Sequence, residues 1–97
     1  MIQIRETSTF RTWLDNLRDT NARNRISVRI RRLAEGNAGD AKSLGGGMSE
    51  LRIDYGPGYR VYFTKRGNEL IMLLAGGDKR TQWKDIDTAR TLLRELE

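Results

Sequence analysis

The spacing of apolar residues changes from alternation to a helical period within the first third of the chain. Residues 1–5 alternate apolar and polar side chains, which predicts a short strand. Two helical stripes follow, and their apolar positions are Phe10, Trp13, Leu14 and Leu17, then Ala22, Ile26, Ile30, Leu33 and Ala34. Cap residues at 7–9 and 19–21 begin these helices, and Gly36 with Asn37 ends the second. The short turn between them predicts an antiparallel helical hairpin.

The second half of the chain predicts three consecutive antiparallel strands. Residues 49–54 and 59–64 alternate apolar and polar side chains, so each has one face directed toward a core. The run within 69–75 is apolar, which favours a central strand covered on both faces. Glycine-containing turns at 55–58 and 66–68 join the three strands.

A C-terminal helix begins near Asp78 or Thr81, either of which can cap it. Its apolar stripe consists of Ile86, Ala89, Leu92, Leu93 and Leu96. Trp83 in its first turn and Trp13 in the first helix are expected to pack in the core. The predicted order is β-α-α-β-β-β-α in a single α+β domain over residues 1–97, with the helices segregated against an antiparallel sheet.

The chain has no cysteine and no histidine among its 97 residues. These absences exclude disulfides, thiolate and histidine metal sites, and a Ser-His-Asp triad. We expect neither a metal nor a cofactor, and a cytoplasmic protein without a membrane-spanning segment. The glycine-rich residues 36–48 predict a mobile connector, because they lack the Walker pattern of a nucleotide-binding loop.

The net charge of +5 indicates a polyanionic partner. Arginines at alternating positions of the predicted strands would present guanidinium groups on one face of the sheet, where the guanidinium fork matches phosphate oxygens. The second helix has a basic outer face of Arg23, Arg25, Arg29, Arg31 and Arg32. That face is either a solvated surface or a stripe that follows a phosphate backbone, and both interpretations stay open.

Three segments resemble a known family. They read Leu-Ala-x-Gly-Asn-x-Gly-Asp at 33–40, Glu-Leu-Arg-Ile-x-Tyr-Gly-Pro-Gly-Tyr-Arg-Val-Tyr-Phe at 50–63, and Leu-Leu-x-Gly-Gly-Asp-Lys-x-Thr-Gln at 73–82. Together they resemble the addiction-module killer proteins, which are HigB-like toxins of the RelE/ParE superfamily, and the predicted element order matches the RelE-like fold. The resemblance implies a toxin of a type II toxin–antitoxin system that cleaves mRNA in the ribosomal A site. It also implies a small helix-turn-helix antitoxin, with operator DNA bound only through the toxin–antitoxin complex.

The resemblance also implies candidate catalytic residues, namely Glu50, Arg52, Arg60 and Lys79. Cleavage through the RNA 2′-hydroxyl needs a base, cations on the phosphate and an acid for the leaving oxygen. Glu50 is the candidate base, and Arg52 and Arg60 are the candidate cations. Lys79 is the candidate acid if neighbouring cations or burial favour its neutral form. Many relatives use a histidine or tyrosine as the acid in this region, and this chain has neither there.

The candidate RNA-binding residues are Arg80, Gln82, Lys84, Tyr62, Arg29 and Arg32. Structural interpretations compete with these roles. Glu50 and Arg52 could form a surface ion pair, Arg60 could pair with Asp54 across the hairpin, and Lys79 could be a solvated turn residue. Two other functions also compete. One is a ParE-like toxin that inhibits DNA gyrase without cleaving RNA, which the missing histidine favours mildly, and the other is a plain nucleic-acid-binding module.

Overall fold

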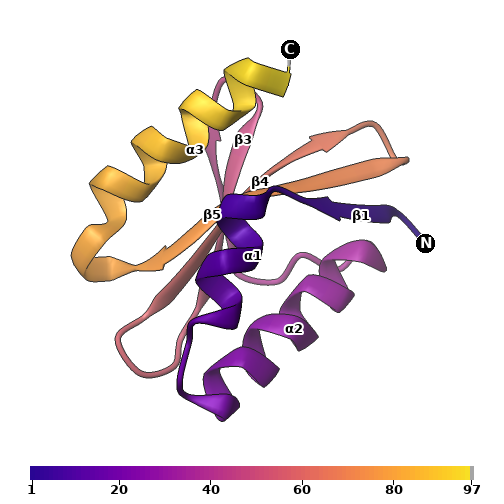
Figure 1. The fold of residues 1–97 in the computed structure, drawn as a ribbon. Coiled ribbons are helices and arrows are strands. Elements are labelled where there is room, and N and C mark those ends of the chain that lie inside the picture. Colours follow the sequence, from indigo (N-terminus) through magenta and orange to yellow (C-terminus); the bar gives the residue numbers. More distant parts are fainter. Residues whose placement is uncertain (97) are drawn as a thin grey trace.

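The computed structural model describes residues 1–96 (Figure 1). The elements run in the order β1 (Gln3–Glu6), α1 (Ser8–Asp15), α2 (Thr20–Ala34), β2 (Ala41–Gly45), β3 (Met48–Ile53), β4 (Tyr59–Arg66), β5 (Leu70–Asp78), a 3₁₀ turn (Lys79–Thr81) and α3 (Gln82–Leu96). In residues 1–96, no helix is both long and apolar enough to cross a membrane.

The five strands form one sheet in the order β1-β5-β4-β3-β2. β1 pairs with β5 in parallel, and the other neighbours pair antiparallel. The prediction of a mixed α+β domain is therefore confirmed, but three details were wrong. The sheet is not wholly antiparallel, it has an additional strand, and its helices cover both faces, with α1 and α2 on one side and α3 on the other (Figure 1).

The additional strand β2 lies inside the predicted glycine-rich connector. It pairs with β3 and turns into it at Gly46-Gly47, where both glycines have positive φ angles of 63° and 84°. The Thr64 hydroxyl donates a 2.7 Å hydrogen bond to the Gly47 carbonyl and ties this turn to β4. The glycines thus form a hairpin turn that only residues tolerating a left-handed backbone can make.

The helices begin where the polar residues predict, and α2 ends next to the predicted Gly36, whereas α1 ends at Asp15, before the predicted stripe residue Leu17. Thr7 caps α1 by accepting a hydrogen bond from the Phe10 backbone, and Asp19 caps α2 by accepting one from Ala22. At the end of α2, the Asn37 backbone donates to the Arg32 carbonyl at 2.9 Å around Gly36, which has a φ of 90°. Local side chain and glycine chemistry therefore accounts for the start of both helices and for the end of α2.

Two hydrophobic cores sandwich the sheet. The larger one lies under α1 and α2 and takes Leu51, Val61 and Phe63 from the strands, and the smaller one lies under α3 and takes Met48 and Leu74. The strand β5 contributes to both cores, so the predicted central strand with two covered faces is confirmed. Since α1 and α2 cover one face of the sheet, side chains that project from the other face lie on the side of α3.

Adjacent glycines near the end of β5 let helices approach both faces. A Cβ at Gly76 would overlap the Trp13 ring beneath the sheet, and a Cβ at Gly77 would overlap the Asp85 carboxylate of α3 above it. Gly77 is also the β5 partner of Arg60 on β4. The absence of a side chain there brings the start of α3 close to Arg60.

Candidate functional site

Two arginines lie directly opposite each other on neighbouring strands. The register pairs Arg52 of β3 with Arg60 of β4, and directly opposed residues project from the same face. Like charges in this arrangement destabilise a sheet. The arrangement therefore costs stability unless an anion or a carboxylate lies between the two groups.

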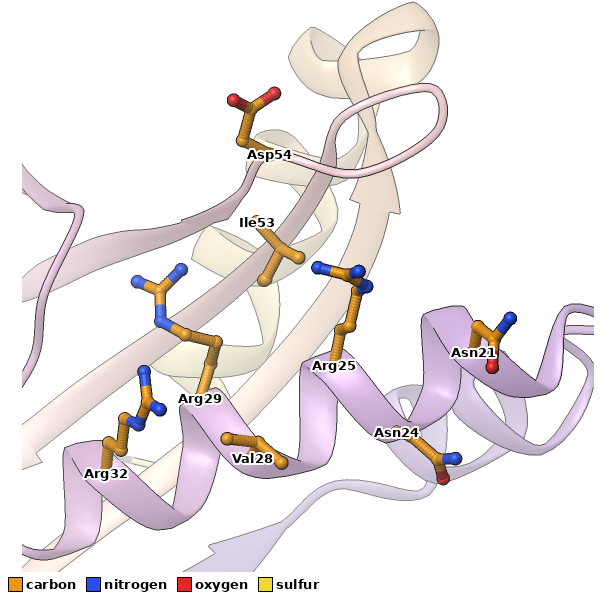
Figure 2. A pocket seen from close by; sticks show the side chains of 8 residues that line it. All are labelled: Asn21, Asn24, Arg25, Val28, Arg29, Arg32, Ile53 and Asp54. Carbon is orange, nitrogen blue, oxygen red and sulfur yellow. The ribbon is translucent and has the colours of Figure 1, made fainter.

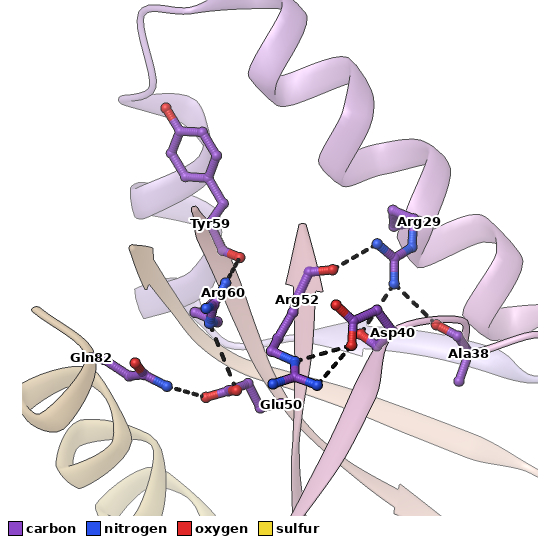
Figure 3. A network of polar contacts seen from close by, with 8 residues as sticks. All are labelled: Arg29, Ala38, Asp40, Glu50, Arg52, Tyr59, Arg60 and Gln82. Carbon is purple, nitrogen blue, oxygen red and sulfur yellow. Dashed lines mark hydrogen bonds and ion pairs between the residues drawn. The ribbon is translucent and has the colours of Figure 1, made fainter. Parts of the chain in front are cut away.

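Arg60 has an unusual environment for a cation. The residue is only 7% exposed, and its Nε lies 3.7 Å from the Glu50 Oε1, while its Nη1 donates to the Tyr59 carbonyl at 3.1 Å (Figure 3). The Nε is buried and lacks a hydrogen-bond partner within residues 1–96. A buried donor without a partner is costly, so the contact with Glu50 leaves the hydrogen-bonding capacity of Arg60 incompletely satisfied.

Glu50 is more buried than its predicted role as a base requires. It is 2% exposed, and its Oε2 accepts a 2.6 Å hydrogen bond from the Gln82 Nε2 at the start of α3 (Figure 3). In this arrangement Glu50 holds Arg60, and Gln82 covers Glu50. The carboxylate can reach a substrate only if Gln82 moves aside, so its role as a base stays a prediction.

Arg52 is held by a different carboxylate. Its Nη2 lies 2.8 Å from the Asp40 Oδ1, and its Nε donates to the same oxygen at 3.1 Å (Figure 3). Both alternative ion pairs considered from the sequence were wrong: Arg52 pairs with Asp40 rather than Glu50, and Arg60 pairs with Glu50 rather than Asp54. The two opposed guanidiniums are thus each fixed from outside the pair.

An open pocket of about 360 Å³ exposes these cations. Its lining includes Arg52, Arg60 and Lys79, two carboxylates, and the hairpin turn at 56–58. The Lys79 stem lies 3.2 Å from the point where a Cβ on Gly58 would be, and the Lys79 backbone donates to the Gly58 carbonyl at 3.0 Å. The absence of a side chain on Gly58 therefore lets Lys79 join the two arginines. Three of the four predicted catalytic residues share this pocket, and the fourth lies directly behind Arg60.

Tyr62 does not have the position that base stacking needs. It lies on the predicted face, but its side chain is fully buried beneath α3 and its hydroxyl has no hydrogen-bond partner in the described part of the chain. Burial, and then the nearby charge of Glu50, raise the pKa of Tyr62 well above its usual range. The prediction that Tyr62 stacks on RNA is wrong for this structure, because α3 covers the ring.

The basic turn after β5 contains the next predicted RNA-binding residues. The Asp78 carboxylate accepts hydrogen bonds from the Arg80 backbone at 2.8 Å and from its Nη2 at 2.9 Å, and the Arg80 side chain hydrogen bond is the main cause that lowers the pKa of Asp78. Lys84 is exposed, whereas Gln82 is occupied by Glu50. Arg80 and Lys84 are thus exposed within a few residues of Lys79, and their contact with RNA stays a prediction.

The tryptophan prediction is half right. Trp13 packs against the larger core, but Trp83 is 78% exposed in the first turn of α3. The apolar face of α3 turns toward the sheet through Ala89 and Leu93, and Trp83 lies outside that face. The sequence did not reveal this exposure. Trp83 lies in the first turn of α3, where its neighbour Gln82 makes the contact with the sheet by donating a hydrogen bond to Glu50.

Arg29 and Arg32 lie at a second groove, of about 630 Å³, between α2 and the end of β3 (Figure 2). Arg29 also has a structural role, since it donates to the carbonyls of Arg52 at 2.7 Å and of Ala38 and Asp40 at 3.2 Å each. Asp54 lines both this groove and the pocket around Arg60. The two basic regions are neighbours at the edge of the sheet, and RNA binding by Arg29 and Arg32 stays a prediction.

Two functional candidates were missed because residues 36–48 were interpreted as a connector. Asp40 holds Arg52, and Lys42 pairs in register with Glu50, so its side chain projects from the same face of the sheet. Residues 41–44 carry no clear strand signal in the sequence, because Ala41 with Ser43 and Lys42 with Leu44 each combine one apolar and one polar side chain on a face. In the part of the chain that the structure describes, no three acidic side chains gather closely enough to hold a metal ion.

Comparison with known proteins assigns the chain to a family. Residues 12–94 match the family described as "Phage derived protein Gp49-like (DUF891)". The chain belongs to the Gp49-like family. It is also 52% identical over 95 residues to an "Uncharacterized protein" of Haemophilus influenzae, which covers 98% of this chain and 96% of that protein. Gp49-like proteins are known as toxins of toxin–antitoxin systems, of the RelE/HigB kind. The matched span includes every residue of the candidate site.

Proposed function

We propose that this protein is the toxin of a type II toxin–antitoxin system and that it cleaves mRNA on the ribosome. The opposed pair of Arg52 and Arg60 is the observation that carries the proposal. Two fixed guanidiniums and an exposed lysine line one open pocket. Cations held in this way stabilise the negative charge that develops on a phosphate in the transition state of cleavage.

The chemistry assigns a role to each residue. Arg52 and Arg60, which both line the pocket, stabilise the charge that develops on the scissile phosphate. Glu50 positions Arg60, and it takes the proton of the 2′-hydroxyl once the substrate displaces Gln82. Lys79, exposed at the rim, donates the proton to the leaving 5′-oxygen. Orientation by the ribosome supplies the rest of the acceleration.

The family association supports an antitoxin partner. We propose a small helix-turn-helix antitoxin with an acidic surface, because the toxin carries a net charge of +5. Operator DNA is then bound through the complex rather than by the toxin alone.

A reconstituted translation reaction tests the nuclease proposal. A defined mRNA is incubated with the wild-type protein or with Arg60→Ala, with and without ribosomes, and the cut sites are mapped by primer extension. We expect ribosome-dependent cuts that fall on the order of 10²- to 10³-fold in the variant, since it loses a preorganised cation. Arg66→Ala is the matched control, because Arg66 lies on the same strand but is exposed and outside the pocket.

Circular dichroism and antitoxin binding establish that Arg60→Ala stays folded, because Arg60 is largely buried. Intact mRNA with a preparation that still inhibits growth would overturn the proposal, and inhibition of DNA gyrase would be measured next. Binding to naked RNA without cleavage would instead identify a plain nucleic-acid-binding module, and that binding would be strongly salt-dependent.

A further inference from the structure

Trp83 is the largest exposed apolar side chain near the candidate site, and the mechanism proposed above does not use it. It is 78% exposed, while Trp13 packs against the core. A tryptophan in water loses the burial that normally stabilises such a large ring. A ring placed in solvent beside a binding pocket therefore suggests a ligand that covers it.

The contacts of α3 define the side on which Trp83 lies. An α-helix turns about 100° per residue, so residues seven apart, such as Trp83 and Arg90, project from nearly the same side. Arg90 donates to the carbonyls of Leu44 at 2.9 Å and Gly45 at 3.3 Å, at the end of β2 just before the turn into β3. The side of α3 that carries Trp83 thus faces the β3–β2 edge of the sheet.

The position along the helix places Trp83 at the pocket end of α3. Its neighbour Gln82 contacts Glu50 midway along β3, whereas Arg90 contacts the far turn two helical turns later. Helical side chains also lean toward the N-terminus of their helix, which here is the turn that contains Lys79. Trp83 therefore lies at the end of α3 that follows Lys79, and Lys79 lines the pocket that holds the opposed arginines.

The charges around the ring favour a nucleic acid over an apolar partner. Lys84 and Arg80 are exposed on either side of Trp83 in the sequence, and Lys42, the β2 partner of Glu50, projects from the same face of the sheet as Glu50. Aromatic rings flanked by cations form the platform on which single-stranded nucleic acids stack their bases. An apolar protein partner would instead require an apolar surround at this rim.

We propose that Trp83 is a stacking platform for an RNA base next to the phosphate held by Arg52 and Arg60. This proposal rests on the proposed function, because it takes single-stranded RNA as the substrate. The ring supplies affinity and orientation rather than charge, so it is a positioning residue and takes no part in proton transfer.

The test measures binding and cleavage separately. A fluorescently labelled single-stranded RNA of mixed sequence, with every 2′-hydroxyl methylated to prevent cleavage, is titrated with wild-type protein, Trp83→Ala, Trp83→Phe and Lys84→Ala. We expect Trp83→Ala to raise the Kd roughly 10- to 100-fold, whereas Trp83→Phe retains most of the affinity. In a plot of log Kd against log salt concentration, Trp83→Ala should keep the wild-type slope. The slope should be smaller by about one in Lys84→Ala if that lysine contacts a phosphate.

Intrinsic fluorescence gives an independent readout. RNA should quench the emission of the wild-type protein, and most of that quenching should vanish in Trp83→Phe, which retains only Trp13. Since Trp83 is exposed, all its variants should keep the wild-type Tm. Unchanged RNA affinity in Trp83→Ala overturns the stacking proposal, and so does a loss confined to antitoxin binding. Cleavage that still depends on Arg60 would show that the nuclease proposal survives that failure, whereas the absence of both RNA binding and cleavage overturns both.

Discussion

Replacing Tyr62 by phenylalanine should stabilise the protein. The Tyr62 hydroxyl is buried beneath α3 and has no hydrogen-bond partner within the described chain. An unpaired buried hydroxyl costs about 1–3 kcal/mol by mutational measurements. The space left by one oxygen atom forfeits part of that gain through lost dispersion contacts. The net stabilisation should be about 1 kcal/mol, and for a domain of this size it corresponds to a Tm increase of about 4–8 °C.

The effect should grow in alkaline solution. Burial and the charge of Glu50 raise the pKa of Tyr62 in the folded state, while in the unfolded chain it is about 10. Below that pH both states keep the phenol proton. Above it the unfolded state loses the proton first, so the stability of the wild-type protein falls by up to about 1.4 kcal/mol per pH unit from this group. The phenylalanine variant lacks this loss.

Thermal unfolding at pH 7 and urea unfolding at pH 7 and 10.5 measure both effects. RNA cleavage by the variant should equal that of the wild-type protein, because Tyr62 is covered by α3. A Tm that falls by several degrees would refute the reasoning, since it would mean that the hydroxyl makes a stabilising hydrogen bond. A loss of cleavage without a loss of stability would restore Tyr62 as a functional residue.

Three further perturbations test the architecture and the partner. Gly77→Ala should destabilise the fold by about 1–3 kcal/mol in urea unfolding, because the new Cβ would overlap Asp85. Gly67→Asn is the control and should be nearly neutral, because Gly67 lies in an open turn with a positive φ that asparagine tolerates. Asp78→Asn should flatten the acid limb of the stability curve. The lowered pKa of Asp78 gives stability that is present above its unfolded pKa of about 3.9 and is lost as the pH falls through the folded value; a wild-type acid limb in the variant would contradict this. The affinity for the antitoxin should fall as salt rises in calorimetric titrations, and an affinity independent of salt would exclude an electrostatic interface.

Much of this fold could be predicted from local patterns. The caps Thr7 and Asp19 and the turn at Gly36 determine helix boundaries through contacts between residues a few positions apart, so they are visible in the sequence. The alternation in β3 and β4 likewise predicted which side chains face the larger core. Chain direction across the sheet was not predictable in this way. β1 runs parallel to β5, and that pairing joins residues far apart in the sequence.

The candidate site shows the same limit. The alternation of Glu50 and Arg52 placed both on one face, and the register then brought Arg60 directly opposite Arg52. Two contacts of the site depended on elements whose placement was not predicted. Asp40, the partner of Arg52, comes from the segment before β2, and Gln82, which covers Glu50, comes from the start of α3. Burial of Tyr62 and exposure of Trp83 follow from how α3 docks on the sheet, which no short segment encodes.

The parallel pairing of β1 with β5 has a consequence for the protein during its own synthesis. β1 emerges first from the ribosome, but within residues 1–96 its only neighbour in the sheet is β5, and the Thr7 hydroxyl donates a hydrogen bond to the Leu74 carbonyl 67 positions later. Contacts this distant in sequence form late, because the loop between them must close first. Gln82, which covers Glu50, and the whole of α3 follow later still. A nascent chain therefore cannot assemble the pocket, and a ribosome completes nearly the whole polypeptide before a competent product exists.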